Sequence, residues 1–298
     1  MSVIIPHLNQ SDALETCLES LDRQTVDNSF FEIIVVDNGS VLPVESIIAR
    51  HSRARLLRES IPGPGPARNR GVMAAIGDIL CFMDADCQAH PDWLRNAFHA
   101  LSSSSKNTIL GGDVQILRDD TAFTAIEAYE SVFAYRQRRY IEKHGFSVMA
   151  NLVVRRTDFD QVGPLRGIEV AEDLDWGLRA RAAGFTCRYM ADMIVFHKAR
   201  QSFGELRLKW DRHIQHSFNM ARGKRWWKVR WIARAFAVAI SPLVSAIQVV
   251  TTERIHGIST RFKALAVLFS LRAYRAWRMV TSLGSPKRIL WNQKTEII

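Results

Sequence analysis

Short apolar runs alternate with amphipathic stretches through the first two thirds of the chain. Residues 2–5 and 32–36 are rich in Val and Ile, and residues 79–83 form a third apolar run bounded by polar residues. Between the first two runs, apolar positions recur from Leu14 at i, i+3, i+4 and i+7, which is the spacing of one helix face. This order of strand, helix and strand predicts an α/β fold with a mostly parallel sheet and flanking helices.

The same stretch contains weaker signals before and after the third apolar run. Proline and glycine mark an irregular loop, and the period of the apolar positions changes several times. The elements expected here are a strand at 55–57, a loop at 61–66, helices at 67–76 and 91–101, a strand at 109–116, an aromatic-rich helix at 121–141, a strand at 148–154, a helix at 170–183 and an extended segment at 189–197.

Beyond about residue 200 the pattern becomes wholly helical. A helix of mixed polarity is expected over 203–220, and residues 235–250 form an uncharged run of 16 residues that contains Ser241 and Pro242. At ~1.5 Å per residue this run measures ~24 Å, which is less than the ~30 Å of a bilayer core. It therefore favours a re-entrant or interfacial helix over a full membrane span.

A second apolar stretch, 264–271, leads into three regularly spaced cations. Arg272, Arg275 and Arg278 follow at i, i+3 and i+6, which predicts a basic amphipathic helix that lies on a surface. The alternative is that both C-terminal helices pack on the rest of the protein as ordinary core. We expect two domains, a catalytic α/β domain over 1–200 and a basic helical extension over 201–298.

Charge is distributed unevenly between these two parts. Residues 1–200 contain 22 Lys and Arg against 26 Asp and Glu, whereas residues 201–298 contain 18 against 4. A basic stretch interleaved with apolar residues suits an anionic membrane surface or nucleic acid. The cationic, Trp-rich segment that begins at Arg222 is typical of a membrane interface, so we expect residues 222–285 to contact an anionic membrane surface and expect no nucleic-acid partner.

Cysteine usage and the first residues bear on the compartment. The four cysteines show no spacing typical of metal ligands, and two of them lie in apolar patterns. The first residues form too short an apolar run for a signal peptide and lack a basic segment before it. These features predict a cytoplasmic protein with inert thiols, peripheral or monotopic on the inner face of the plasma membrane.

Carboxylates follow two of the predicted strands. Asp84 and Asp86 come directly after the run 79–83, and Asp37 ends the run 32–36. The carboxyl ends of parallel strands form the ligand-binding edge of such a sheet. Asp84 and Asp86 can hold a divalent cation there, and Asp37 can accept hydrogen bonds from a nucleoside. A turn cap for Asp84 and an Asx turn for Asp37 are the structural alternatives.

Three further groups complete the candidate chemistry. Arg68 opens a predicted helix, where a guanidinium suits a diphosphate or a base edge. Glu172 and Asp173 begin another helix, and a carboxylate there can serve as a general base or simply as a helix cap. His197 ends the extended segment, where an imidazole can ligate a metal or play a structural part.

Together these residues form a pattern known from one enzyme family. The order and spacing of the pattern, over about residues 1–200, resemble those of the family 2 glycosyltransferases with a GT-A fold. The resemblance implies a GT-A-type, Rossmann-like, mostly parallel sheet with flanking helices, followed here by the α-helical C-terminal extension. The segments that carry the resemblance are Ser2-Val3-Ile4-Ile5-Pro6-His7-Leu8-Asn9, Asp37-Asn38-Gly39-Ser40, Gly65-Pro66-Ala67-Arg68-Asn69, Asp84-Ala85-Asp86, Glu172-Asp173-Leu174-Asp175 and His197.

The resemblance implies roles for individual residues. Asp173 matches the proposed catalytic base, which deprotonates the acceptor hydroxyl. Residues implied on the donor-nucleotide side are Pro6, His7, Asn9, Asp37, Arg68 and Asp84; those on the acceptor side are Asn151, Glu172, Asp175 and Trp176; those that hold Mn²⁺ or Mg²⁺ are Asp84, Asp86 and His197. The chain departs from the usual pattern at Leu8, Asn38 and Met149, which bears on nucleotide and acceptor preference.

The activity implied is an inverting transfer of a sugar from a nucleoside-diphosphate donor to a hydroxyl. A UDP-sugar is favoured as donor, and a glycan or lipid-linked acceptor in cell-surface polysaccharide or glycolipid synthesis is expected. Arg222 to Trp226 also fits the RxxRW pattern of processive family members. Competing hypotheses are a nucleotidyltransferase on a similar sheet, a non-catalytic basic protein that binds membrane or nucleic acid, and a catalytically inactive scaffold.

Overall fold

The chain divides into two units. The computed structural model describes residues 1–118, 122–223 and 225–284, so Thr121 of the predicted helix 121–141 and residues 224 and 285 of the stretch 222–285 lie outside the described residues. The first unit contains residues 1–117 and 135–198, and the second contains 118–134 and 199–298. The second unit thus combines the C-terminal helices with a short internal segment of the chain.

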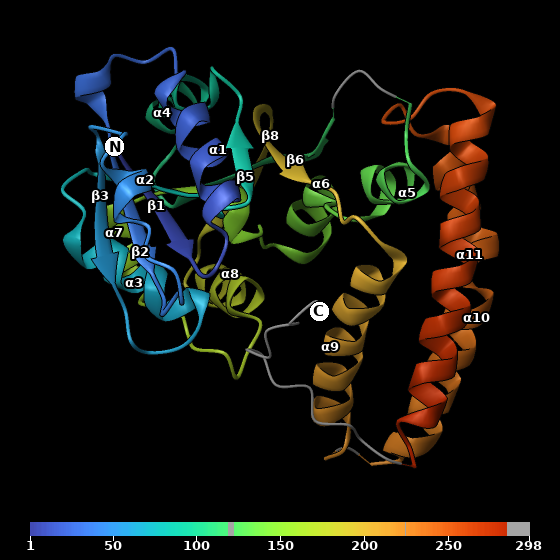
Figure 1. The fold of residues 1–298 in the computed structure, drawn as a ribbon. Helices are drawn as coiled ribbons and strands as arrows, with labels where there is room; N and C mark the ends of the chain where they lie inside the picture. The colour runs from blue at the N-terminus through green and yellow to red at the C-terminus, as the bar shows by residue number, and fades with distance from the viewer. Residues whose placement is uncertain (119–121, 224, 285–298) are drawn as a thin grey trace. The chain divides into compact units, whose positions relative to one another are not determined.

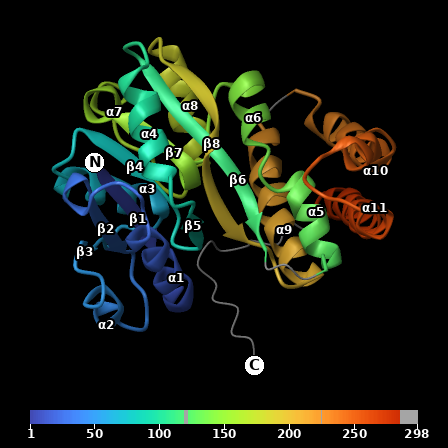
Figure 2. The same cartoon turned by 90° about the horizontal axis from the view of Figure 1, so that it is seen from above.

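The first unit is built on one mixed sheet of eight strands (Figure 1). The strand order is β3-β2-β1-β4-β7-β6-β8-β5, with the neighbours of β1, the pair β2–β3 and the pair β6–β8 parallel, and the remaining pairs antiparallel. The strands are β1 (Ser2–His7), β2 (Glu32–Asp37), β3 (Ala54–Arg58), β4 (Ile79–Phe82), β5 (Cys87–Ala89), β6 (Thr108–Leu117), β7 (Leu152–Arg155) and β8 (Thr186–Lys198). Figure 2 shows β6 and β8 as two long neighbouring strands.

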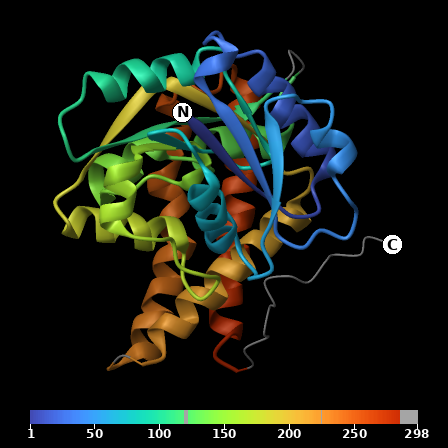
Figure 3. The ribbon, with the colours of Figure 1, turned by 90° about the vertical axis from the view of Figure 1, so that its left-hand side faces the viewer.

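Helices cover both faces of this sheet. Along β1, Val3 and Ile5 pack with α1, α2 and α4 on one face, whereas Ile4 packs with α3, α7 and α8 on the other. The helices of this unit are α1 (Ser11–Asp22), α2 (Glu45–Ile48), α3 (Pro64–Ala74), α4 (Trp93–Ser102), α6 (Gln137–Arg139), α7 (Arg156–Val162) and α8 (Glu172–Ala182). Figure 3 looks onto the side where β1 to β3 lie next to one another. The three-layer α/β architecture with flanking helices agrees with the predicted fold class.

Strand β1 continues through a proline that the sequence pattern predicts as its end. Pro6 pairs with Val36 of β2, and β1 ends at His7. On its other side, β1 pairs with β4 only as far as Ile4 opposite Phe82. Because successive N–H groups alternate in direction, the nitrogen of Pro6 faces the side where β4 has already ended. The missing N–H therefore removes no hydrogen bond from the sheet.

The second unit consists of four helices in the described residues. They are α5 (Ala125–Phe133), α9 (Phe203–Ala221), α10 (Trp227–Thr251) and α11 (Ile258–Thr281). Helix α5 starts with a capping box in which Thr124 and Glu127 bond each other's backbone N–H groups. It ends at Phe133, so the prediction of one continuous helix over 121–141 is wrong: the chain passes to the first unit at Tyr135 and forms α6 and a π-helical turn (Tyr140–His144) there.

Helix α10 is longer than its uncharged core suggested. It has 25 residues, or ~37 Å at ~1.5 Å per residue, and among the described residues it is the one helix long and apolar enough to cross a membrane. Pro242 lies inside it. A proline has no backbone N–H, so the carbonyl of the residue four positions earlier loses its usual donor. Here that carbonyl belongs to Val238. The hydroxyl of Ser241 donates to the carbonyl oxygen of Val238 at 2.7 Å, and the helix continues through Pro242.

The arginines of α11 do not all face outward as a surface-lying helix requires. The guanidinium of Arg275 lies 3.4 Å from the centre of the Trp210 ring of α9, and its side chain is buried. Arg278 donates to the carboxylate of Asp211 at 3.0 Å. Two of the three cations therefore bind α11 to α9 within this unit, and the expected basic face is reduced accordingly.

Candidate active site

Polar side chains gather where the central strands of the first unit end. His7 at the end of β1 is opposite Asp37 at the end of β2. Phe82, the last residue of β4, is opposite Ile4, so the chain that continues to Asp84 emerges at the same edge of the sheet. On the far strands, His197 of β8 is opposite Cys87 of β5, which immediately follows Asp86. The register thus brings together residues that are far apart in sequence.

His7 and Asp37 form the core of a buried polar network. Nδ1 of His7 lies 3.2 Å from Oδ1 of Asp37, and the backbone N–H of Gln10 donates to Nε2 of His7 at 3.1 Å. Because Nε2 accepts, Nδ1 carries the proton and donates toward Asp37. Asn9 accepts from the N–H of Val41 at 2.8 Å. These bonds fix the loop after β1 against the turn after β2, beside the half-buried Pro6.

Arg68 connects two acidic groups that the sequence separates by about ninety residues. From helix α3, its Nη2 donates to Oδ1 of Asp84 at 2.5 Å and its Nη1 donates to Oε1 of Glu172 at 3.0 Å. The guanidinium is buried, and its Nε has no hydrogen-bond partner among the described residues. Burial raises the pKa of Asp84 even though the charge of Arg68 opposes the rise. Arg68 therefore links the aspartates after β4 to the start of α8.

Asp86 and His197 face each other in a way that calls for a proton or a cation between them. Nδ1 of His197 lies 2.6 Å from the carbonyl oxygen of Lys198, which only accepts, so Nδ1 carries the proton. Nε2 lies 3.2 Å from Oδ2 of Asp86. In a neutral ring this places a lone pair against a carboxylate, an arrangement that a proton on Nε2 or a divalent cation satisfies. Burial raises the pKa of Asp86, but the bond to His197 and its charge outweigh burial and lower it overall.

This donor set fits a divalent ion that takes only a few ligands from the protein. Within residues 1–118, 122–223 and 225–284 no three His, Cys, Asp or Glu side chains are already arranged around one metal position. Asp86 and His197 converge, whereas Asp84 is bound to Arg68. Mg²⁺ and Mn²⁺ commonly use one or two carboxylates and complete their shell with substrate phosphates. Asp86 and His197, together with Asp84 once it is released from Arg68, would provide such a small set of protein ligands.

Asp173 is a carboxylate whose pKa is clearly raised by its surroundings. It lies in the first turn of α8, and one oxygen accepts from the N–H of Leu174 at 2.7 Å. Burial, followed by the charge of Glu172, raises the pKa of Asp173 to about 6, with Arg68 opposing the rise. No Lys, Arg or His in the described part of the chain forms an ion pair with it. Asp173 is therefore available to exchange a proton near neutral pH.

Asn151 was predicted on the acceptor side, but its side chain forms hydrogen bonds inside the sheet. It is fully buried, and it accepts from the indole N–H of Trp93 at 2.9 Å. Its amide donates at 2.8 Å to the carbonyl oxygens of Asp113 and Met193. Those carbonyls flank a bulge where the pairing of β6 and β8 shifts register after Gly112. With its hydrogen-bonding groups occupied, Asn151 stabilises the bulge and has no free polar group for an acceptor.

Gly112 belongs to the same arrangement, although the motifs gave no sign of it. A Cβ atom on Gly112 would lie 2.2 Å from the carbonyl oxygen of Met193 and 2.3 Å from the amide nitrogen of Asn151. Only glycine leaves room for the Asn151 amide at the bulge. Two adjacent glycines inside a predicted strand were the available signal, because such glycines often mark a bulge or a close backbone approach.

Two other predicted acceptor-side residues also have structural partners. Trp176 is completely buried, and its indole N–H donates to the carbonyl oxygen of Gly163 at 3.0 Å. Asp175 forms ion pairs with Arg179 at 2.9 Å and Arg166 at 3.1 Å. Of the predicted acceptor-side residues, Glu172 alone therefore joins the carboxylate network, through Arg68.

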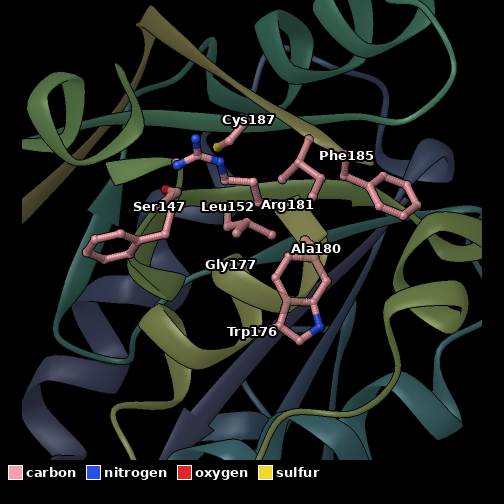
Figure 4. A pocket seen from close by; sticks show the side chains of 11 residues that line it. Ser147, Leu152, Trp176, Gly177, Ala180, Arg181, Phe185 and Cys187 are labelled. Atoms are coloured by element: carbon pink, nitrogen blue, oxygen red, sulfur yellow. The ribbon is translucent and has the colours of Figure 1, made fainter. Parts of the chain in front are cut away.

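A small cavity lies beside helix α8 (Figure 4). Its walls come from α8, the segment around Ser147 and the start of β8, with Trp176, Arg181 and Phe185 among the side chains that line it. Its volume is about 10 Å³, which is roughly the space that one water molecule needs. This cavity is too small for a sugar and contains none of the carboxylates described above.

Three residues near the carboxylates were not predicted from the sequence. The side chain of Gln10 bonds Asp86 and helps to lower its pKa. The Tyr135 ring packs 4.9 Å from the His197 ring, and the N–H of Asn9 donates to the hydroxyl of Ser40 at 2.9 Å. The turn after β2 signalled Ser40 only as part of a motif, and nothing in the pattern pointed to Gln10 or Tyr135.

Comparison with known families identifies the family to which this chain belongs. The family model described as "Glycosyl transferase family 2" matches residues 2–163, which is more than half of the chain. The chain belongs to glycosyl transferase family 2. The match includes β1 to β7 and thus the strand ends that carry Asp37, Asp84 and Asp86. Family membership confirms the resemblance and makes the protein a glycosyltransferase.

Two curated glycosyltransferases are similar over most of the chain. Glycosyltransferase AglE of Haloferax volcanii is 32% identical over 253 residues, which are 82% of this chain and 80% of that protein. The amylovoran biosynthesis glycosyltransferase AmsB of Erwinia amylovora is 27% identical over 220 residues, which are 68% of this chain and 71% of that protein. The similarity therefore extends beyond residue 163.

Solved structures share the fold. The mannosyltransferase PcManGT from Pyrobaculum calidifontis, in complex with GDP-Man and Mn²⁺, has a TM-score of 0.62 at 17% identity, covering 96% of this chain and 87% of that one. S. aureus TarS 1-349 in complex with UDP-GlcNAc has a TM-score of 0.55 at 16% identity, covering 91% and 90%. These likenesses confirm the predicted GT-A-type fold of this family 2 member.

Proposed function

We propose that the protein is an inverting glycosyltransferase that moves a sugar from a nucleoside-diphosphate donor to an acceptor hydroxyl. The observation that carries the proposal is the Arg68 bridge. One guanidinium contacts Asp84 in the donor-side motif and Glu172 beside the candidate base Asp173. Metal-binding and proton-accepting groups thus belong to one network, as a displacement at a sugar carbon requires. Family membership favours this activity over the nucleotidyltransferase and inactive-scaffold hypotheses.

The donor half of the site would hold the nucleoside and the diphosphate. Pro6, His7, Asn9 and Asp37 border the nucleoside, with UDP as the favoured carrier. Asp86 and His197, joined by Asp84, would hold Mn²⁺ or Mg²⁺, and the complex of the mannosyltransferase PcManGT with GDP-Man and Mn²⁺ supports this choice of metal. A bound divalent ion supplies charge stabilisation for the leaving diphosphate. The unpartnered Nε of Arg68 is a further donor for the diphosphate.

The acceptor half depends on Asp173. Its carboxylate takes the proton of the acceptor hydroxyl while that oxygen forms a bond to the anomeric carbon. The bond from this carbon to the diphosphate oxygen breaks in the same step, and the nucleoside diphosphate leaves with the electron pair. A pKa of about 6 keeps most Asp173 ionised at neutral pH while leaving it basic enough to accept the proton. A single displacement of this kind inverts the sugar carbon.

The helical extension would associate with a membrane. Support comes from α10, whose exposed side chains include Phe236, Leu243 and Val244. A glycan or lipid-linked acceptor, in polysaccharide or glycolipid synthesis on the inner face of the plasma membrane, suits such an enzyme. AmsB, whose name refers to amylovoran biosynthesis, is consistent with that class of product. On this proposal the first unit carries catalysis, and the second unit, which contains α10, carries membrane contact.

The decisive experiment measures donor binding and turnover together. Thermal-shift titrations with UDP-, GDP- and dTDP-sugars, each with and without Mn²⁺, identify the donor. Hydrolysis or transfer of that donor is then followed in Mn²⁺ and after thorough EDTA treatment, with Asp86→Asn as the matched variant. We expect a metal-dependent shift with one sugar nucleotide and loss of turnover in both the EDTA and the Asp86→Asn samples. Turnover that survives EDTA would contradict the metal assignment, and no shift with any sugar nucleotide would contradict the function.

A further inference from the structure

The second unit contains a cavity that the proposed transfer reaction does not use. Its volume is about 320 Å³, and it lies between the end of α9 and the beginning of α10. The α9 side contributes Ser217 and Met220, and the α10 side contributes Trp227, Arg230, Trp231 and Arg234. The indole N–H of Trp231 donates to the carbonyl oxygen of Met279 in α11 at 2.8 Å, which fixes one wall. The cavity is thus large enough for a ligand group and combines aromatic rings with two guanidinium groups.

The sequence around these guanidinium groups is rich in cations and lacks acidic residues. Residues 212–252 include no Asp or Glu but seven Lys or Arg, namely Arg212, Arg222, Lys224, Arg225, Lys228, Arg230 and Arg234. Arg230 and Arg234 are exposed and form no ion pair within the described part of the chain. Arg234 lies with its guanidinium carbon 5.8 Å from the centre of the Trp231 ring. The cavity therefore offers two unneutralised cations to an anion.

The position of the cavity along α10 indicates the kind of anion. After Arg234 the helix carries no charged residue up to its end at Thr251. Its exposed apolar side chains continue along this uncharged part, at Phe236, Ile240, Leu243, Val244, Ile247 and Val250. In a bilayer such an apolar part lies among acyl chains, and the cationic, Trp-bearing end lies at the level of the headgroups. The cavity is at that cationic end, because Trp227 and Arg230, which line it, lie in the first turn of α10.

We propose that this cavity is a binding site for the phosphate headgroup of one membrane lipid. The inference rests on the membrane association in the proposed function and adds a discrete, saturable site to it. Arg230 and Arg234 would bind the phosphate oxygens, because a guanidinium fork matches phosphate geometry. Trp227, Trp231 and Met220 would contact the glycerol and the first methylene groups. The charge complementarity and the apolar helix beside the cavity select a lipid phosphate as occupant over a free phosphate ion.

The site is tested with the full-length protein and a lipid that stays monomeric. Short-chain phosphatidic acid, kept below its critical micelle concentration, is titrated while tryptophan fluorescence is recorded, because two tryptophans line the cavity. We expect saturable binding by the wild type and at least about tenfold weaker binding by Arg230→Gln/Arg234→Gln, because the variant loses the charged hydrogen bonds to the phosphate. Arg222→Gln/Arg225→Gln is the matched control, with the same change of charge outside the cavity, and should bind like the wild type.

A second variant keeps the charges and removes the space. Ser217→Phe places a ring into the cavity from α9, and it should weaken phosphatidic acid binding while its circular dichroism and melting temperature show that it folds. Equal losses in the two arginine pairs would overturn the site, because they indicate attraction by diffuse charge alone. Full competition by inorganic phosphate or by a single-stranded oligonucleotide at equal concentration would also overturn it.

Flotation with vesicles separates this inference from the proposed function. On phosphatidylcholine vesicles doped with a small fraction of phosphatidic acid, wild type and both arginine variants should float, because α10 provides the apolar contact. Failure of the wild type to float on any vesicle contradicts membrane association itself. Flotation of all proteins together with equal phosphatidic acid affinities contradicts only the headgroup site.

Discussion

The two units differ in how they treat charge. In the first unit, charged groups at the strand ends are joined in partly buried pairs: Arg68 with Asp84 and Glu172, and Asp86 with His197. In the second unit, Arg230 and Arg234 at the beginning of α10 form no ion pair within the described residues, and apolar side chains on the same helix are exposed. Paired charges hold a catalytic geometry before substrate arrives, whereas unpaired charges and apolar surface require a partner from outside.

The largest effect is expected from removing the candidate base. Asp173→Asn should lower sugar transfer by about 10³-fold, because an amide cannot accept the acceptor proton. Donor affinity, measured by calorimetry, should stay close to that of the wild type. Asp175→Asn is the control on the same helix turn, and it should keep its rate within a few-fold because Asp175 pairs with Arg166 and Arg179. Normal turnover by Asp173→Asn would refute the assignment.

The raised pKa of Asp173 predicts two opposite pH dependences. Activity requires the ionised form, so kcat/KM should fall as pH decreases through about 6. Folding favours the neutral form, because the folded protein binds the proton more tightly than the unfolded chain, where the pKa is 3.8. This stabilisation is complete below the unfolded value and is lost as pH rises through about 6. Asp173→Asn should therefore unfold at higher urea than the wild type at pH 8, and an identical midpoint would contradict the shift.

Breaking the buried bridge should lower stability strongly. Arg68→Met leaves Asp84 and Glu172 without their shared partner, and we expect the free energy of unfolding to fall by about 3 kcal/mol. Arg58→Met removes an ion pair with Glu45 in which the two side chains are 72% and 51% exposed, and it should cost less than about 1 kcal/mol. Urea unfolding of both variants measures the difference. Equal losses would show that burial of the bridge contributes nothing.

Asn151 separates a structural from an acceptor-binding role. Asn151→Ala removes three buried hydrogen bonds and leaves Trp93 without an acceptor, so the free energy of unfolding should fall by about 3 kcal/mol. Asn96→Ala, which removes a single bond to the carbonyl of Asp192, should cost less than about 1 kcal/mol. The folded Asn151→Ala protein should keep the acceptor KM of the wild type, and a large rise in KM with little loss of stability would restore the acceptor role.

The smallest effect on stability is expected at the exposed face of α10. Phe236→Ser/Leu243→Ser changes side chains that are 68% and 69% exposed, so the free energy of unfolding should change by less than about 0.5 kcal/mol. Vesicle flotation should nevertheless be lost. Val249→Ser, at a fully buried position of the same helix, should do the reverse and lower stability while preserving flotation. Flotation by the exposed-face variant would contradict membrane contact through α10.

The strand ends were predictable because two local signals coincide there. An apolar run followed at once by an acid located Asp37 and Asp84, and the order of the motifs identified the family. The Arg68 bridge was not predictable, because its two partners are 16 and 104 residues away and only the complete fold brings them together. The pattern placed Arg68 near the donor and gave no sign of its contact with Glu172.

The motif predicts acceptor-side roles for Asn151 and Trp176, and the sequence does not show in which direction these side chains point. An asparagine or tryptophan that binds a sugar and one that completes a core look alike in a motif, and the direction of the side chain decides between them. Likewise, Ser241 and Pro242 resemble a helix interruption, although the serine hydroxyl replaces the missing hydrogen bond at the carbonyl of Val238. In each case a single contact outside the local pattern determines the outcome.

The position of α5 in the chain has a consequence for synthesis on the ribosome. Its buried Glu130 pairs with Arg200, which is 70 residues later, and its apolar side packs with α11, which is later still. At a translation rate of about 5–20 residues per second, Arg200 is synthesised about 4–14 s after Glu130. The strands of the first unit can pair during that interval, while Tyr129 and Phe133 are still uncovered. Slowed or interrupted translation after β8 should therefore leave the apolar side of α5 exposed and recruit chaperones or proteases to it.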